Sequence, residues 1–369
     1  MIPVCEPSLT DRERELLLEC FDQGWVSSHG PYVDRFEEAW AAYCGMAYGV
    51  AVSSGTAGLD IAAALLDLHP GDEVIMPAFT IISCAQPIVG RGGVPVLVDL
   101  DPVFWQMQVD QIRASITPKT RAIMVVHLYG HPADMDPVSQ LAREYELLVI
   151  EDAAEAHGAQ YKGRLCGGLG DISVFSFYAN KLITTGEGGM LLTNREDAAA
   201  RARSFRNLCF QPSRRFLHEQ IGFNYRLTNL QAAIGLGQIE RMDGIVRKKR
   251  QIAQAYRERL KDIDGLQLPA EASWAKSIYW VYGIVVDEAL GVDARLLANR
   301  LKARGVETRP FFLGMHQQPV FRNMGLFLKD EFPVSERLSR QGLYLPSGLS
   351  LRDEDIEYIC GAVRSALSG

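Results

Sequence analysis

Short apolar segments alternate with helical segments through the first two hundred residues, and this order restricts the fold more than any other feature. Most of the apolar segments are continuously apolar, as in strands that helices cover on both faces. Between them, residues 56–68 and 136–147 have helical spacing and polar starts. The alternation predicts an α/β domain with a mostly parallel sheet. Its seven expected strands are residues 48–54, 72–77, 94–99, 122–129, 147–152, 172–177 and 188–193.

The last third of the chain predicts a second, smaller unit. Residues 228–260 have the spacing of one long helix, in which Gly235, Gly237 and Gly244 are candidate bend points. A chain of 369 residues can form two domains. We therefore expect a large domain over residues 1–240 and a small C-terminal α+β domain over residues 241–369. In the small domain the pattern predicts strands at 279–287 and 307–312 and helices at 293–306 and 351–367.

Composition excludes several classes of protein. A net charge of −7 gives no reason to expect nucleic acid or an anionic membrane as a partner. No apolar run approaches the roughly 18 residues of a membrane span, and the N-terminal segment lacks the pattern of a signal peptide. The seven cysteines are scattered without C-x-x-C spacing, which favours reduced thiols and offers no cluster for a metal. We therefore expect a cytoplasmic protein without a metal centre.

Small residues at 52–60 connect an expected strand to an expected helix. The N–H groups at a helix start, together with the helix dipole, suit a phosphate group. Gly55 lets the backbone approach closely, and Thr56 adds a hydroxyl donor. The same pattern is typical of an ordinary strand-to-helix turn with a Ser or Thr cap, and this segment alone favours that alternative.

Two carboxylates, Glu151 and Asp152, end the apolar segment 147–152. Ligands of open α/β sheets bind at this edge, and an ionised carboxylate buried there needs a cation or several donors. A protonated pyridine nitrogen is such a cation, and Glu155 could reach a neighbouring substituent of the same ring. The alternative is that Asp152 caps a following helix, and this segment alone does not decide between the two.

Lys181 lies between an apolar segment that ends near Ser176 and the glycine-rich segment 184–189. A lysine that attacks a carbonyl carbon must lose its proton, and partial burial or a nearby cation lowers its pKa. Lysines in loops commonly reach solvent instead. Here almost all neighbours in the sequence are apolar, small or aromatic, so we interpret Lys181 as a candidate nucleophile.

Asn224, Tyr225 and Arg226 precede the expected helix at 228–260 and offer donors of the kind that bind anions. On this segment alone, a helix-start loop capped by Thr228 or Asn229 is the better interpretation.

A phosphate cradle, a carboxylate for a ring nitrogen and a lysine for an aldehyde are together the requirements of pyridoxal 5′-phosphate. This cofactor accepts the electrons released when a C–H bond of an attached amine breaks. A lysine that binds the aldehyde can afterwards carry the proton. The combined pattern therefore predicts a pyridoxal phosphate enzyme with Lys181 as the catalytic residue.

The chain also resembles the DegT/StrS-type nucleotide-sugar aminotransferases, a fold-type I family of pyridoxal phosphate enzymes. The resemblance runs almost end to end and includes "GDEVIMPAFT", "VIEDAAEAHGA", "FSFYANKLITTGEGGM" and "GFNYRLTNLQAAIGLGQIERMD". It implies that Lys181 binds the cofactor covalently and that Asp152 contacts its ring nitrogen. It also implies a homodimer with shared active sites, in which Asn224 reaches the phosphate of the neighbouring subunit. The positions that it assigns to the phosphate within one subunit are Thr56, Ala57 and Ser176.

Two positions depart from the common pattern of this family. Many members have glutamine where this chain has Glu155, although the branch that makes GDP-perosamine resembles it in having glutamate. Many members also place an aromatic residue at the position of Ile81 to stack on the cofactor ring. Either Ile81 covers the ring here, or the nearby Phe79 contributes.

The resemblance implies transfer of an amino group from L-glutamate to a nucleotide-linked keto sugar. The segments "RPFF" and "EDAAEA" resemble most the branch that aminates C4 of GDP-4-keto-6-deoxymannose to give GDP-perosamine. Arg309 and His316 are the candidate sugar-binding residues, and the alternative for His316 is a loop residue packed on 319–321.

Other reactions and roles fit the same resemblance. The substrate could be a dTDP- or UDP-linked keto sugar aminated at C3 or C4, or the protein could be a non-catalytic regulator. The joint presence of Lys181, Asp152 and Ser176 argues against a regulator. Lys181 by itself also argues against the sugar dehydratases of the family that carry histidine in place of the lysine.

Overall fold

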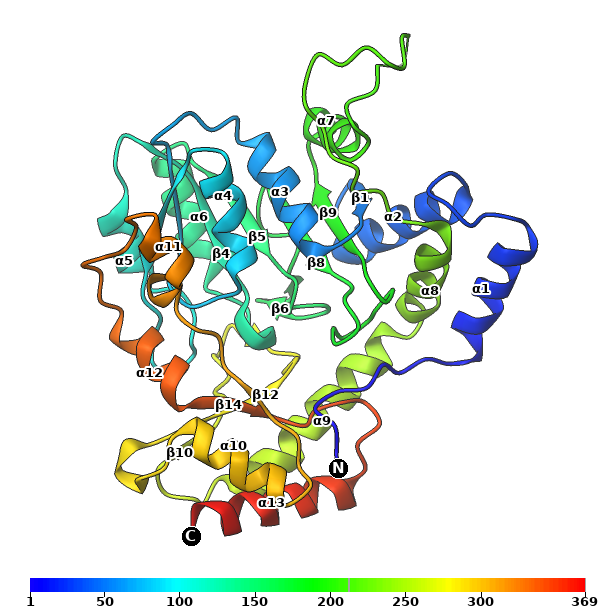
Figure 1. Cartoon of the computed structure of the whole chain (residues 1–369). Coiled ribbons are helices and arrows are strands. Elements are labelled where there is room, and N and C mark those ends of the chain that lie inside the picture. The colour runs from blue at the N-terminus through cyan, green and yellow to red at the C-terminus, as the bar shows by residue number, and fades with distance from the viewer. Residues whose placement is uncertain (212, 369) are drawn as a thin grey trace.

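Seven strands form one central sheet in the computed structural model, which describes residues 1–211 and 213–368 (Figure 1). The strand order is β1-β9-β8-β5-β4-β2-β3. All pairs from β3 to β8 are parallel, and β9 is antiparallel to both of its neighbours. The prediction of an α/β fold with a mostly parallel seven-stranded sheet is confirmed. The bounds are β1 Tyr48–Val52, β2 Glu73–Pro77, β3 Val94–Val98, β4 Thr120–Val126, β5 Leu148–Asp152, β8 Ile172–Ser176 and β9 Gly189–Thr193.

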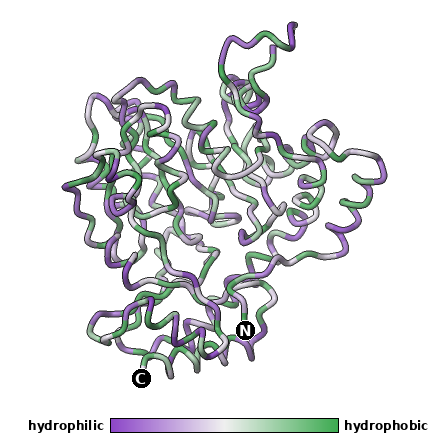
Figure 2. Tube along the Cα trace, in the orientation of Figure 1, coloured by the Kyte–Doolittle hydropathy of each residue, from purple (hydrophilic) through white to green (hydrophobic). Residues whose placement is uncertain are grey.

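Helices cover the sheet and account for its continuously apolar strands. Every residue of β8 and β9 is buried, and α3 packs on both strands, whereas α6 packs on β4 and β5. Figure 2 shows the hydrophobic colouring concentrated in the interior strands and the hydrophilic colouring along outer helices and loops. The helices of this part are α1 Asp11–Asp22, α2 Pro31–Cys44, α3 Gly55–Leu65, α4 Gln86–Gly90, α5 Val109–Ser115, α6 Met135–Glu144, α7 Glu196–Arg206 and α8 Asn229–Ile239.

The C-terminal part forms a smaller sheet with its own hydrophobic cluster. The sheet has the order β10-β12-β14-β13, and side chains such as Tyr256, Leu297 and Ile359 form the cluster beside it. The segment 311–338 instead packs on the large cluster around the central sheet, through Phe321 among others. The domain boundary at 240/241 therefore stays a prediction. The elements are α9 Met242–Leu260, β10 Leu266–Gln267, β12 Tyr282–Val286, α10 Ala294–Ala303, β13 Arg309–Pro310, α11 Pro319–Asn323, α12 Pro333–Gln341, β14 Gly342–Leu345 and α13 Asp353–Leu367.

The prediction of one long helix over residues 228–260 is wrong in one respect. The chain forms two helices there, α8 and α9, with a break at Glu240 and Arg241. Arg241 leaves the helical conformation, and its side chain bonds Glu13 of α1 at 3.0 Å. The glycines do not mark the break. A Cβ at Gly235 would lie 2.5 Å from the ring of Phe36, so this glycine permits close helix packing.

A small third sheet, β11-β6-β7, lies beside the central one; its strands are β6 Gln160–Tyr161, β7 Arg164–Leu165 and β11 Ala275–Lys276. It joins the segment after β5 to the segment before β12, so it connects the two parts of the chain. None of the described helices is long and apolar enough to cross a membrane.

Candidate active site

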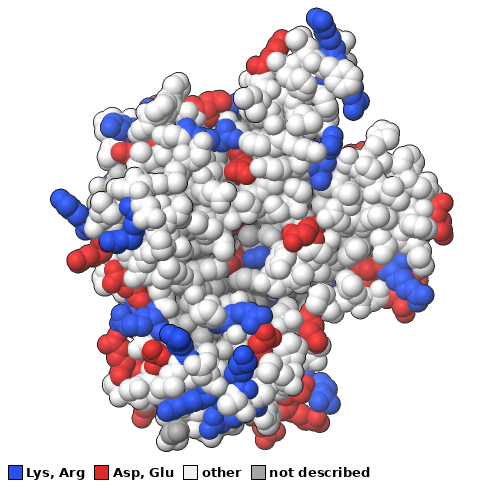
Figure 3. Space-filling view, in the orientation of Figure 1, with Lys and Arg blue, Asp and Glu red and all other residues white. Residues whose placement is uncertain are grey.

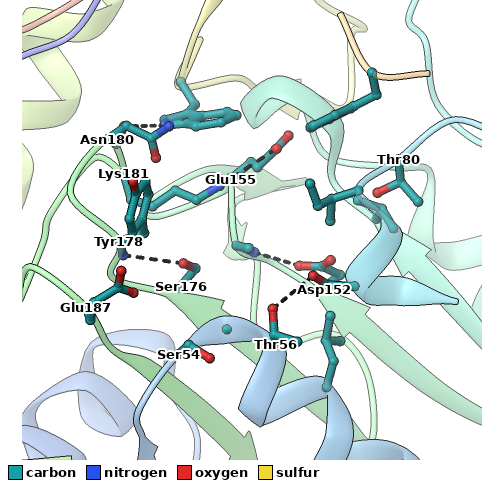
Figure 4. Close-up of a pocket in the computed structure, with 18 of the residues that line it drawn as sticks. Ser54, Thr56, Thr80, Asp152, Glu155, Ser176, Tyr178, Asn180, Lys181 and Glu187 are labelled. Atoms are coloured by element: carbon teal, nitrogen blue, oxygen red, sulfur yellow. Dashed lines mark hydrogen bonds and ion pairs between the residues drawn. The ribbon is translucent and has the colours of Figure 1, made fainter. Parts of the chain in front are cut away.

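A cavity of about 420 Å³ opens where β5 and β8 end, beside the start of α3 (Figure 4). Small-molecule sites typically have volumes of roughly 300–1,000 Å³. Part of its wall comes from the C-terminal part of the chain, so the site lies between the two parts. Figure 3 shows that the molecule is hollowed on this face, with both basic and acidic side chains around the hollow. Six of the predicted site residues line the cavity: Gly55, Thr56, Asp152, Glu155, Ser176 and Lys181.

Asp152 is the carboxylate of β5 that faces the cavity. Successive side chains of a strand point to opposite faces of the sheet, so only one of the two acidic neighbours can do so. Asp152 is 2% exposed; its Oδ2 accepts a bond from the Cys84 thiol at 3.1 Å and its Oδ1 from the Ala154 N–H at 3.0 Å. Turns rather than a helix follow it, so the alternative of a helix cap is excluded. Glu151 faces away from the cavity and bonds His127, Gly167, Leu169 and Gly170.

Lys181 reaches into the same cavity from the loop after β8. Its side chain is 12% exposed, and burial lowers the pKa of its ammonium group below the ordinary value. Its Nζ lies 3.8 Å from Oε1 of Glu155, and Figure 4 shows the two groups facing each other. A buried amine with a lowered pKa loses its proton more readily, which is what a nucleophile toward an aldehyde needs.

Glu155 is the second buried acid of the cavity. Its Oε2 accepts a bond from the Tyr129 N–H at 2.7 Å, and Tyr129 holds this N–H in place with a left-handed backbone, φ 55°. Burial raises the pKa of Glu155 to about 7, although Lys181 acts in the opposite direction. The carboxyl group of Glu155 can therefore hold a proton near neutral pH.

Replacing Glu155 with glutamine should flatten the dependence of stability on pH in the cofactor-free protein. The folded pKa, about 7, lies above the ordinary value of 4.5, so this group favours folding when protonated. Its contribution is complete below the ordinary pKa and is lost as the pH rises through the folded pKa. We expect the wild type to lose on the order of 1–3 kcal/mol between about pH 5 and pH 8 relative to Glu155→Gln. Urea unfolding measures the difference, with the exposed Glu357→Gln on α13 as control; parallel curves for Glu155→Gln and wild type would contradict it.

The start of α3 forms one end of the cavity, where a phosphate is predicted to bind. Ser54 lines the cavity and caps the helix by accepting a bond from the Ala57 N–H at 3.1 Å. Ala57, one of the predicted phosphate positions, does not itself line the cavity. The hydroxyl of Thr56 bonds Ser83 at 2.9 Å, and Ser176 lies opposite on β8 (Figure 4). Hydroxyl groups and first-turn N–H groups of a helix together suit a phosphate.

Replacing Gly55 with alanine should weaken cofactor binding. A Cβ at this position would lie 2.8 Å from Cβ of Ser176, so the helix start must move away from β8. Overpacking of this kind costs on the order of 1–3 kcal/mol, and we expect much of it to appear as lost affinity. Absorbance titration of cofactor-free protein measures the dissociation constant. Gly361→Ala on α13, where a Cβ meets open space, is the control, and equal affinity of Gly55→Ala and wild type would contradict the cradle.

Besides Ala57, three predicted residues do not line the cavity of their own chain: Asn224, Arg309 and His316. Asn224 is exposed and forms an isolated bridge with Asn207. Arg309 is exposed beside the cavity and pairs with Glu307 at 2.6 Å. The role of each stays a prediction.

His316 is buried away from the cavity, which favours the alternative of a packed loop residue. Its Nε2 lies 3.0 Å from Glu336, and its ring packs edge to face on Phe332. Its assignment to the sugar is not supported by this placement.

The position expected to cover the cofactor ring is occupied by an aliphatic side chain. Ile81 lines the cavity and is 42% exposed, whereas Phe79 is fully buried and packs on Tyr129 and Phe312. Of the two candidates, only Ile81 can face a ligand here.

Several lining residues escaped the sequence analysis. Tyr178 stands three residues before Lys181 in the same motif, so its proximity was a usable signal. Trp280 and Tyr344 come from about 100 residues or more downstream, and nothing local marks them. Cys84, which does not line the cavity but bonds Asp152, had no signal in the sequence either.

These side chains fit pyridoxal phosphate. A buried carboxylate suits a protonated ring nitrogen, a capped helix start suits the phosphate, and an amine with a lowered pKa suits the aldehyde. Among the described residues, no group of three or more His, Cys, Asp or Glu side chains is placed to hold a metal ion.

Comparison with known proteins leads to the same chemistry. Residues 7–364 match the DegT/DnrJ/EryC1/StrS aminotransferase family. The chain belongs to this family. It is a pyridoxal phosphate-dependent sugar aminotransferase, as predicted.

Members of the DegT/DnrJ/EryC1/StrS family resemble the chain over almost its whole length. It is 41% identical to the GDP-perosamine synthase of Caulobacter vibrioides over 99% of this chain and 98% of that protein. It is 35% identical to a putative pyridoxal phosphate-dependent aminotransferase, EpsN, of Bacillus subtilis, covering 95% and 91% of the two chains. The crystal structure of aminotransferase TlmJ from Streptoalloteichus hindustanus superimposes with a TM-score of 0.93 at 33% identity, covering 100% and 99%.

Proposed function

We propose that this aminotransferase moves the amino group of L-glutamate to C4 of GDP-4-keto-6-deoxymannose and so produces GDP-perosamine. The observation that carries the proposal is the 41% identity to a GDP-perosamine synthase over nearly the full length of both chains. Glu155, which distinguishes this branch from many relatives, lies beside Lys181 and supports the same choice.

The residues of the cavity divide the chemistry among them. The bound cofactor supplies an electron sink for the C–H bond that breaks next to nitrogen. Asp152 would stabilise positive charge on the ring nitrogen of the cofactor, because its carboxylate is buried and oriented by Cys84 and Ala154. Lys181 would take the proton from the carbon on one side of the transferred nitrogen and deliver it to the carbon on the other side. Glu155, 3.8 Å away, stabilises the charged form of Lys181.

A substrate comparison tests the proposal. Purified protein with L-glutamate should aminate GDP-4-keto-6-deoxymannose and form GDP-perosamine, detected by mass spectrometry as an amino sugar with retained nucleotide. dTDP- and UDP-linked 4-keto-6-deoxy sugars should react far more slowly. Amination of only the dTDP or UDP sugar would overturn the substrate assignment, and no amination of any sugar would favour a regulatory role.

Charge balance supports a homodimer with shared active sites. The charged side chains that line the cavity are one base, Lys181, and three acids, Asp152, Glu155 and Glu187. A cofactor phosphate, a dicarboxylate and a sugar nucleotide are all anions, so this lining requires further cations. A second copy of the chain is the proposed source of these cations, and the neutral amide of its Asn224 is proposed as a hydrogen-bond donor to the phosphate.

The segment between α7 and α8 is suited to reach a second copy. It projects from the body of the molecule at the top of Figure 1. Phe216 is 82% and Ile221 is 94% exposed, next to the exposed Arg214 and Arg215. Exposed apolar side chains with neighbouring charges are typical of a surface that another protein covers.

Mixing two inactive variants tests shared sites. Lys181→Ala and Asn224→Ala place their lesions in different subunits of one site, so a mixed dimer contains one intact site. Unfolding and refolding the two variants together should therefore restore partial amino transfer, and refolding either alone should not. No restoration in a mixture that sediments as a dimer would contradict sharing through Asn224.

A further inference from the structure

The segment that leads into β12 places an indole ring against the amine of Lys181. Trp280 is 6% exposed, and its ring centroid lies 3.8 Å from Nζ of Lys181. The face of an indole ring attracts an ammonium group through its quadrupole. Because Trp280 belongs to the C-terminal part of the chain, the two parts of the protein meet at the reactive amine.

Trp280 is fixed in this position at its side chain and at its backbone. Its Nε1–H donates to the carbonyl of Asn180, the residue before Lys181, at 2.9 Å. Its own carbonyl accepts a bond from Nζ of Lys249 at 2.7 Å, and Lys249 also donates to the carbonyl of Ser347 at 2.6 Å. Turning the indole ring away from Lys181 would break its Nε1–H bond, and the bonds from Lys249 hold the backbone that carries the ring.

Burial of the Lys249 ammonium group is energetically unfavourable, which is unusual for a side chain that only holds two backbone carbonyls in place. It lies on α9 with 4% of its surface exposed, and burial lowers its pKa to about 8. Within residues 1–211 and 213–368, no carboxylate forms an ion pair with it. Burying an ammonium group without a counter-charge is unfavourable, and both carbonyls that it binds belong to segments around the cavity wall.

We propose that Trp280 holds the Lys181 amine in position while this amine is not covalently bound, and that Lys249 is the positioning residue for Trp280. The inference rests on the function proposed for Lys181, whose amine must be released and used again in each cycle. The ring stabilises the charged amine without accepting its proton and excludes water from one side. Glu155 lies on another side of the amine and can accept a proton.

The reactivity of Lys181 in cofactor-free protein tests this role. Trace acetic anhydride labels neutral amines, so labelling across a pH series, read by peptide mass spectrometry, reports the neutral fraction of each lysine. The exposed Lys329 serves as internal standard. We expect Lys181 in Trp280→Leu to be roughly 2- to 30-fold more reactive at a given pH, because the charged form loses its ring contact. Trp280→Phe, with a weaker ring, should fall between Trp280→Leu and wild type.

The other titratable groups that face Lys181 stay unchanged in these variants, so they do not confound the comparison. They are Glu155, Asp152, Cys84 and His157.

Lys249→Met tests the positioning role. It should raise the reactivity of Lys181 in the same direction, and adding it to Trp280→Leu should add little, because both act through one ring. Trp274→Leu is the matched control, since Trp274 packs on Phe104 outside this cavity.

An unchanged pH profile of Lys181 in Trp280→Leu, or a shift to higher pH, would overturn the inference. If Trp280→Leu does not fold, as judged by thermal melting, Trp280→Phe and Lys249→Met carry the same test. The labelling experiment uses no sugar substrate. Its outcome therefore does not depend on whether the proposed sugar is correct.

Discussion

Lys181→Ala should lower the rate of amino transfer by roughly 10³- to 10⁴-fold. The variant loses both the nucleophile toward the aldehyde and the base that moves the proton, and the described cavity contains no second amine. Single-turnover absorbance changes with L-glutamate measure the effect in protein incubated with excess cofactor.

Two further variants define the cause of this loss. Lys181→Arg keeps the positive charge but cannot lose its proton, so it should be nearly as inactive as Lys181→Ala. Lys329→Ala, at an exposed position, should match wild type. Turnover by Lys181→Arg or Lys181→Ala within tenfold of wild type would contradict the assignment.

Asp152→Asn should lower the rate by roughly 10²- to 10³-fold while the protein still binds cofactor. Asparagine has nearly the same shape, so the bonds from Ala154 and Cys84 can be largely kept. The variant loses the negative charge that favours a protonated ring nitrogen, and the electron sink weakens with it. Stopped-flow half-reactions with L-glutamate measure the rate, and cofactor titration measures the affinity separately.

The exposed Asp264→Asn serves as the matched control for this substitution. A large loss of affinity with an unchanged rate in Asp152→Asn would mean that Asp152 only anchors the cofactor. A rate equal to that of wild type would show that the negative charge of Asp152 is not needed for amino transfer.

The central sheet could be predicted from the sequence because its strands are buried on both faces and therefore read as continuous apolar runs. The break between α8 and α9 could not, since Arg241 leaves the helix to bond Glu13, more than 200 residues earlier. Local helical spacing carries no information about such a contact. The strand expected over 307–312 shortens to β13, because only Arg309 and Pro310 of this segment pair with β14.

Some residues of the candidate site could likewise be predicted from the sequence, and others could not. Asp152 and Ser176 end two strands at one edge of the sheet and Lys181 follows the second of them, so their meeting follows from topology. The choice between Glu151 and Asp152 required the pleat of β5, which the structure supplies. Trp280 and Tyr344 reach the cavity only through the packing of the C-terminal part on the sheet. His316 bonds Glu336 and packs on the ring of Phe332 outside the cavity lining, contacts that its motif does not reveal, and its role toward the sugar stays a prediction.

The most direct test of the account is to locate the bond between protein and cofactor. Borohydride reduction of the cofactor-loaded protein, followed by digestion and peptide mass spectrometry, fixes the cofactor to the lysine that holds it. We predict a single pyridoxyl group on Lys181. A label on another lysine, such as the buried Lys249, or no label on any lysine, would contradict the account.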